Sequence, residues 1–425
     1  MASDDFWVLQ TRFTMRNKSF YIGLLGVVFM TSITPQRSFA NEITLGVLTS
    51  SGVQRSMYAA FEKEFEAANP DIQLTILIRS DAEYKEEMKT WFAQGEGPDI
   101  LNWQAGERLY QYVRDNKVKD ISHIWKKNGL GSVFSDAVKG AVSYENKRYA
   151  IPISYYQWGF YYRQSLFEEH GLSAPTTWDE FLAVCATLKA AGVTPITIGA
   201  QYKWPTAAWF DYLNLRINGL EFHQKLLKGE IVYTDSRVES VFNHWKILLD
   251  KGYFVDRHNG WNWQQAMPFM YHKLAGMTLI GNFFAGTLPL VLKDDFRFFR
   301  FPIIDLSVDV YEEAPLDLFM VPSYAKENPA IEKFLLFLAS KDFQQKFNET
   351  LGMISTNLTS DVSDDYFIQV GAETLNASVG VSQFFDRDAN ADMSSAAMEI
   401  FTAFLDTKNV SVTLKKLEEA RKEHY

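Results

Sequence analysis

The chain has very little cysteine, and this scarcity limits what it can be. Cys185 is the single cysteine among 425 residues, so an intramolecular disulfide is excluded. The seven histidines are scattered and none stands in an H-x3-H frame, which argues against a structural metal. We therefore expect no metal and no cofactor, and we expect Cys185 to be a small core residue of an amphipathic helix.

Other signatures of function are missing as well. The sequence has no GxGxxG motif and no P-loop, so a nucleotide site is not expected, and it has no GxSxG motif of a serine hydrolase. After residue 40 no apolar run is long enough to span a bilayer. The net charge of −10 disfavours nucleic acid and anionic lipid as partners. These absences predict a soluble chain that binds neither nucleic acid nor membrane.

The first 40 residues have the pattern of a cleavable leader. A basic stretch at 15–18 precedes an apolar run over 20–32 that is too short to cross a membrane, and a small-x-small site ends at Ala40. We expect translation to begin at Met15 and the mature chain to begin near Asn41. A lipid-anchored lipoprotein needs a cysteine at the cleavage point, and none is there. The leader thus predicts a freely diffusing periplasmic protein.

Past the leader, short β-rich runs alternate with amphipathic helical patterns, which is typical of α/β layers. Strands are expected over 43–48, 72–78 and 99–101, each followed by a helix. Extended stretches at 149–162 and 317–321 are candidates for crossings between two lobes. No flexible linker separates the lobes, so the chain should enter each lobe more than once. We assign 1–40 to the leader, 41–155 with 317–352 to an N-terminal lobe, and 156–316 with 353–425 to a C-terminal lobe.

Aromatic residues are the most informative feature that is present. The chain has eleven tryptophans, and several fall at the ends of predicted strands or in the loops that follow. A flat apolar ring matches the C–H face of a sugar, and carboxylates, amides or an arginine can bond its hydroxyls. The alternative for each ring is a place in the core. These tryptophans are Trp103, Trp158, Trp204, Trp209, Trp261 and Trp263.

Two motifs carry this idea in the first half of the chain. Asp99 begins a short buried strand and Trp103 lies just past its end, so both could contact a ligand, although Asp99 could also cap a helix or brace a turn. On the first crossing, Tyr156 and Trp158 share one face and Gln157 lies on the other. One of these faces should meet a cleft, unless both are buried in a sheet interior.

Further motifs follow along the chain. Trp204 stands before a proline at a helix N-terminus, where free N–H groups can meet polar ligands. Asp211 is two residues beyond Trp209, so at most one of the two can point into a site. Trp263 lies in a loop before a predicted helix and Asn282 follows a predicted strand, and both are good places for ligand contacts. The run from 384 to 388 places two aromatics beside an acid–base–acid triplet, which is either a sugar contact or a surface turn.

With these motifs identified, the chain resembles an extracellular solute-binding protein of a carbohydrate ABC importer, family 1, of the maltose- and maltodextrin-binding type. The resemblance covers essentially the whole mature chain. It rests on five stretches in this order: Gly97-Pro98-Asp99-Ile100 with Trp103, Tyr149–Tyr162, Pro175–Phe181, Gly276–Phe283 and Phe319–Pro322.

The resemblance implies a periplasmic-binding-protein-like fold (type II) with two α/β lobes, a hinge and an interlobe cleft that closes over the ligand. It implies that Phe283 stacks on the sugar, at a position where relatives often have tryptophan. It also implies that Phe385, Asp386 and Arg387 match a motif of one subgroup. The predicted ligand-binding set is Asp99, Trp103, Tyr156, Gln157, Trp158, Trp204, Asp211, Trp263, Asn282, Phe283, Asp317, Phe385, Asp386 and Arg387.

The function predicted from these residues is the capture of a neutral mono- or oligosaccharide by hinge closure and its delivery to the membrane permease of an ABC importer. We expect a monomer without catalytic activity. Two alternatives stay open at this point. A secreted glycoside hydrolase would also combine tryptophans with carboxylates, although no paired-carboxylate motif is evident. A protein of the same fold could instead bind a polyamine-like solute in an acidic aromatic box.

Overall fold

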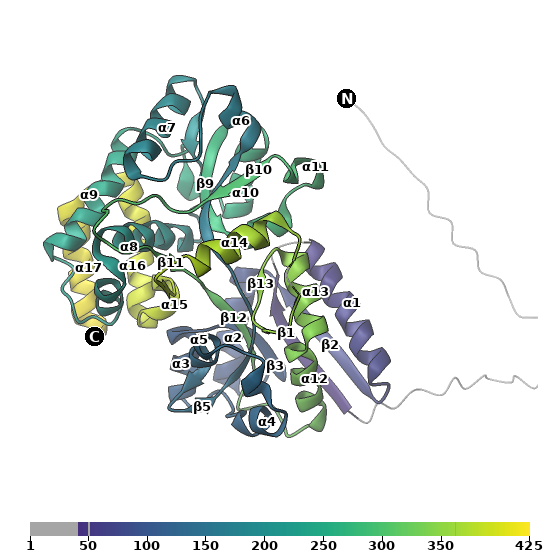
Figure 1. Ribbon diagram of the computed structural model, residues 1–425. Coiled ribbons are helices and arrows are strands. Elements are labelled where there is room, and N and C mark those ends of the chain that lie inside the picture. The colour runs from purple at the N-terminus through teal and green to yellow at the C-terminus, as the bar shows by residue number, and fades with distance from the viewer. Residues whose placement is uncertain (1–40, 50–51, 362) are drawn as a thin grey trace, which may run out of the picture. The chain divides into compact units, whose positions relative to one another are not determined.

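The computed structural model describes residues 41–49, 52–361 and 363–425 (Figure 1). The predicted leader lies outside the described residues. Within the part described, no helix combines the length and the apolar character that a membrane span requires. Two larger sheets, one of six strands and one of four, organise the chain from residue 41 onward.

The six-stranded sheet contains the strands predicted near the N-terminus. Its order is β13 (Ile354–Ser355), β6 (Ala150–Tyr155), β12 (Leu316–Met320), β3 (Ile100–Gln104), β1 (Asn41–Leu48) and β2 (Ile72–Arg79). β1 runs parallel to both β2 and β3, whereas β12 is antiparallel to β3 and β6. Because the carboxyl ends of β1, β2 and β3 meet at one edge, the loops after them are brought together there.

Helices cover this sheet through their aromatic side chains. α1 (Gly52–Ala68) meets α13 (Lys341–Leu351) through Phe61 and Phe343, with ring centroids 4.6 Å apart. α12 (Pro329–Ala339) joins this layer, and Figure 1 shows the three helices at one side of the sheet. α2 (Asp81–Gln94) begins with a capping box of Ser80 and Glu83, so the cap is Ser80 and the carboxylate of Asp81 is left for other contacts.

The four-stranded sheet organises the second half of the chain. Its order is β10 (Phe296–Phe299), β7 (Trp158–Arg163), β9 (Ala275–Gly281) and β8 (Thr194–Ile196). The helices around it are α6 (Gln164–Glu169), α7 (Trp178–Ala190), α8 (Trp204–Leu227), α9 (Ser236–Asp250), α10 (Trp263–Tyr271), α14 (Tyr366–Asn376), α16 (Ala391–Thr407) and α17 (Val410–His424). α7 begins with a capping box of Thr177 and Glu180, and Cys185 is buried on this helix as expected.

We call the six-stranded sheet with its helices the six-stranded half, and the four-stranded sheet with its helices the four-stranded half. The chain passes between them at 156–157, where β6 gives way to β7, at 314–315, between β11 (Tyr311–Glu313) and β12, and again between β13 and α14. The stretch predicted as a second crossing, 317–321, is instead a strand of the six-stranded sheet. The lobe boundaries given above stay a prediction.

One short helix connects the two halves. α15 (Phe385–Asp388) has its first residue in the core of the four-stranded half, where the Phe385 ring packs against Phe210 and Phe401. The Phe385 backbone N–H donates to Asp211 Oδ2 over 2.8 Å. Asp211 is fully buried on α8, so the position of α15 depends on a polar group inside the core.

Asp211 belongs to a buried polar cluster. Gly219, at φ 78°, kinks α8 and returns the chain so that His223 lies near Asp211 and near Glu313 of β11. His223 Nε2 is 3.8 Å from Asp211 Oδ1 and 4.0 Å from Glu313 Oε1. Burial raises the pKa of Asp211 and of Glu313 well above the ordinary carboxyl range and lowers the pKa of His223 to about 3. The uncharged form of each group is therefore favoured.

This cluster makes stability depend on pH. Folding raises the pKa of Glu313, so the folded chain keeps a proton that the unfolded chain releases, and the free energy of unfolding falls as pH rises above the ordinary glutamate range. Glu313→Gln removes that dependence. We expect the variant to melt about 2 °C above the wild type at pH 8 and at the same temperature near pH 4.5, measured by circular dichroism. A variant less stable than the wild type at pH 8 would show that the ionised carboxylate is needed.

Candidate ligand-binding site

A cavity of about 450 Å³ lies between the two halves and takes lining residues from both. On the six-stranded half, Thr49, Ser80 and Gln104 line it, and each stands at the carboxyl end of β1, β2 or β3. The parallel pairing of these strands brings the three ends to one sheet edge, which is where α/β folds generally bind ligands. The topology thus explains where the cavity lies.

The wall from the four-stranded half is aromatic. Phe283, in the turn after β9, is at its centre, and its ring meets three tryptophans edge to face. The ring centroids lie 5.2 Å from Trp263, 5.9 Å from Trp158 and 6.0 Å from Trp204. Edge-to-face contact is the favoured geometry for such rings, so each ring holds the others in place. Phe283 stays only partly buried, and its ring is available to a ligand.

A glycine makes this wall possible. Trp158 at the start of β7 pairs with Gly281 at the end of β9. A Cβ on Gly281 would lie 2.6 Å from Trp158 Nε1 and 2.7 Å from the Phe283 ring. Any larger residue at 281 would therefore displace the two rings that the wall depends on.

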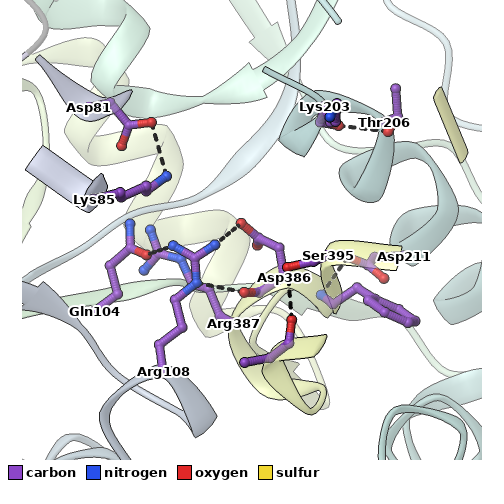
Figure 2. Close-up of polar contacts among 12 residues, drawn as sticks. Asp81, Lys85, Gln104, Arg108, Lys203, Thr206, Asp211, Asp386, Arg387 and Ser395 are labelled. Atoms are coloured by element: carbon purple, nitrogen blue, oxygen red, sulfur yellow. Dashed lines mark hydrogen bonds and ion pairs between the residues drawn. The ribbon is translucent and has the colours of Figure 1, made fainter. Parts of the chain in front are cut away.

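The opposite wall is polar and consists of paired charges. Lys85 Nζ lies 2.9 Å from Asp81 Oδ2, both on α2 (Figure 2). Arg387 Nη1 lies 3.1 Å from Asp317 Oδ1. All four side chains line the cavity. Burial raises the pKa of Asp317 and lowers the pKa of Lys85, and in each case the partner's charge opposes the shift.

Asp386 is paired as well, with a residue behind the wall. Arg108 Nη2, on α3 (Glu107–Arg114), donates to Asp386 Oδ2 over 2.7 Å (Figure 2). Arg387 also donates from Nη2 to the hydroxyl of Tyr156, 2.9 Å away. Arg55 differs from these residues: it is exposed, and it forms no ion pair with the described part of the chain.

Several polar atoms of the lining lack a partner. Trp158 Nε1, Ser154 Oγ and Thr49 Oγ1 are buried and form no hydrogen bond within the residues described. A buried polar group without a partner costs about 1–3 kcal/mol. These three groups therefore favour a ligand that offers hydrogen-bonding atoms.

The structure brings most of the predicted site residues together and leaves others elsewhere. Those in the cavity lining are Tyr156, Trp158, Trp204, Trp263, Phe283, Asp317, Asp386 and Arg387. Those outside the lining are Asp99, Trp103, Gln157, Asp211, Asn282 and Phe385.

Each residue outside the lining has a partner inside the protein. The Asp99 carboxylate accepts hydrogen bonds from the N–H and the hydroxyl of Thr44, both at 2.8 Å, and so braces β1 against the start of β3. Trp103 is buried and donates from Nε1 to the Arg108 carbonyl at 2.9 Å. Asp99 thus holds two strands together, whereas the alternatives given above were a helix cap and the bracing of a turn.

The other residues outside the lining support the site from behind. Gln157 faces away from the cavity and donates from Nε2 to the Phe367 carbonyl at 2.8 Å. Asn282 accepts from the Tyr161 hydroxyl at 2.6 Å. Tyr156 and Trp158 share the cavity face, so of the two faces considered for the crossing strand, theirs is the one that meets the cavity. Neither Trp209 nor Asp211 lines it.

Part of the polar wall consists of residues that were not predicted from the sequence. Asp81, Lys85 and Gln104 line the cavity but stand in no recognisable motif. A usable signal was present, since Gln104 ends β3 and Asp81 begins the helix after β2. Phe385 was predicted to line the cavity, but its neighbour Phe384 does so instead. The Phe384 ring faces Trp158, with 4.5 Å between ring centroids, whereas Phe385 points into the core.

Known proteins resemble this chain in sequence and in fold. Residues 50–345 match the family of bacterial extracellular solute-binding proteins. The multiple sugar-binding protein of Streptococcus mutans is 23% identical over 360 residues, 78% of this chain and 81% of that one. An uncharacterised ABC transporter extracellular-binding protein of Pyrococcus horikoshii is 25% identical over 312 residues, 72% of this chain and 69% of its own.

Among solved structures, the bacterial solute receptor AcbH superimposes with a TM-score of 0.85 at 26% identity, over 90% of this chain and 99% of that one. AcbH is described as having an exclusive preference for β-D-galactopyranose. A maltose-bound MalE3 of T. maritima superimposes with a TM-score of 0.76 at 17% identity, which supports the periplasmic-binding-protein fold.

The family match spans well over half of the chain and excludes the glycoside hydrolase alternative, since these proteins bind solutes without transforming them. With its α/β periplasmic-binding-protein fold and a cavity between its two halves, this chain belongs to the bacterial extracellular solute-binding protein family.

Proposed function

We propose that this protein binds a neutral sugar in the cavity between its halves and delivers it to the permease of an ABC importer. The observation that carries the proposal is the contrast between the two walls, rings on one side and paired charges on the other. Relatives named for sugar binding, the multiple sugar-binding protein and AcbH, support it.

The two walls suit the two surfaces of a pyranose. One face of a sugar ring presents C–H groups, which can pack on Phe283 and the tryptophans around it. The hydroxyls then point to the polar wall, where Lys85 and Asp386 can donate and accept. Trp158 Nε1, which has no partner within the described chain, can donate to an oxygen at the edge of the ring.

The charges of the cavity favour a ligand without charge. Lys85 and Arg387 are each paired with a carboxylate of the same wall. A uronate would have to break one of these pairs or leave its own charge buried, and both are costly. Arg55 is exposed and screened by solvent, so it cannot compensate the negative charge of a uronate deep in the cavity. Galactopyranose is the first sugar to test, because AcbH is similar over nearly its whole length.

Capture by closure also belongs to this proposal. The segments at 156–157 and 314–315 join the halves and can act as a hinge. A sugar stabilises the closed form only as far as it binds that form better than the open one. We further propose an exported, monomeric protein whose leader is cleaved near Ala40 and which carries no lipid anchor.

A ligand screen tests the proposed function directly. We expect D-galactose or another neutral sugar, at a concentration about 100 times its Kd, to raise the melting temperature by a few degrees in a thermal-shift panel. Galacturonate, putrescine and spermidine should give no shift. A panel in which only polyamines or uronates stabilise the protein would contradict the proposal.

A pair of matched variants tests the aromatic wall. Phe283→Ala removes the central ring of the cavity, and we expect it to weaken sugar binding by roughly 10- to 100-fold in calorimetric titration, because ring burial contributes about 1.5–3 kcal/mol. Phe269→Ala is the control, since Phe269 is a similarly half-buried ring on α10 outside the lining. Equal affinities of the two variants would count against the wall as a stacking surface.

A further inference from the structure

We propose that Arg108 is a positioning residue that sets which sugar hydroxyl the cavity recognises, although it does not line the cavity itself. The inference rests on the proposed sugar-binding function and assigns specificity within that site. Arg108 lies in the first turn of α3 behind the polar wall, and its guanidinium group donates three hydrogen bonds.

The guanidinium group of Arg108 holds two cavity residues at once (Figure 2). Nη2 donates to Asp386 Oδ2 over 2.7 Å, and Nε donates to the Asp386 carbonyl over 2.6 Å. Nη1 donates to Oε1 of Gln104. The group also lies 5.9 Å from the centroid of the Trp103 ring, which limits its movement on the remaining side. Both Asp386 and Gln104 line the cavity.

These contacts fix which polar atoms of Gln104 and Asp386 are bonded to Arg108 and which remain available to a ligand. Arginine has donors and no acceptor, so the oxygen of the Gln104 amide must face Arg108 and the NH₂ group must face away from it. By the same bond Asp386 Oδ2 is occupied, and Asp386 Oδ1 has no donor among the residues described. Arg108 thereby leaves one acceptor on Asp386 and one donor on Gln104, on the two sides of its guanidinium group (Figure 2).

This pair matches a hydroxyl group. A sugar hydroxyl can donate to Asp386 Oδ1 while it accepts from Gln104 Nε2, whereas a deoxy position can do neither. Sites built to bond a hydroxyl reject the analogue that lacks it, because their own polar groups are left unpaired. A lysine at 108 would keep the positive charge, but its point charge cannot hold the amide and the carboxylate in one plane.

Asp386 is positioned from the other half as well. α15 carries it, and α15 is fixed to the four-stranded half by the buried Phe385 ring and its N–H bond to Asp211. α3, which carries Arg108, lies on the six-stranded half, next to β3. The acceptor on Asp386 and the donor on Gln104 are therefore brought together only when α15 of one half and α3 of the other are in contact.

The test compares Arg108→Lys with the wild type, titrated calorimetrically with D-galactose, maltose and D-glucose and with the monodeoxy analogues of whichever sugar binds. We expect the wild type to bind one monodeoxy analogue at least tenfold more weakly than the parent sugar. In Arg108→Lys the parent sugar should bind about tenfold more weakly while that analogue keeps its affinity. The ratio of the affinity for the parent sugar to that for the analogue should therefore approach one. Arg114→Lys, on the same helix, where Arg114 forms an ion pair with Glu107, is the matched control and should leave the dissociation constants of the sugar and of its analogue unchanged.

The outcomes separate the inference from the proposed function. A wild type that binds no neutral sugar, either in this titration or in the thermal-shift panel, means that the proposed function has failed. If the wild type binds a sugar and Arg108→Lys weakens the binding of the parent sugar and of its analogue equally, Arg108 only supports the fold. That result would overturn the inference. Gln104→Met removes the amide donor at similar volume and should lower the affinity ratio for the same analogue; an effect on a different analogue would also overturn it.

Discussion

The cavity depends on one short turn that is anchored in both halves of the molecule. In α15, Phe385 is fixed in the core of the four-stranded half, and its N–H group bonds the buried Asp211. The next two side chains, Asp386 and Arg387, bond Arg108 and Asp317 of the six-stranded half. Because these charges are largely buried, each is stable only with its partner in place, so the turn ties the polar wall to both halves.

The aromatic wall is held by a different physical principle. Phe283 and three tryptophans meet edge to face, which fixes the rings relative to one another without a hydrogen bond. Gly281 is the residue that permits this packing, because nothing larger fits between Trp158 and Phe283. A rigid apolar surface and a prepaired polar surface both lower the cost of ordering side chains when a ligand binds.

Much of the fold and part of the site could be predicted from residue patterns. The strands after the leader and the buried Cys185 follow from periodicity and composition, and these expectations are confirmed. Aromatic residues at strand ends, such as Trp158 and Phe283, line the cavity because a strand end at a sheet edge leaves its side chains near the ligand. Asp99 shows the limit of this reasoning: its carboxylate bonds Thr44, fifty-five positions earlier in the chain, and no local pattern reveals that pairing.

Composition and local periodicity are enough to predict the α/β class, the alternation of helices and strands and the aromatic character of the site, because each of these depends on neighbouring residues. Which polar residues share the cavity follows from the three-dimensional packing alone. Arg108, Asp386 and Gln104 become neighbours through strand order and the anchoring of α15, with 278 positions separating the first two. Hydrogen bonds act over about 3 Å in space, and distance along the chain carries no information about such contacts.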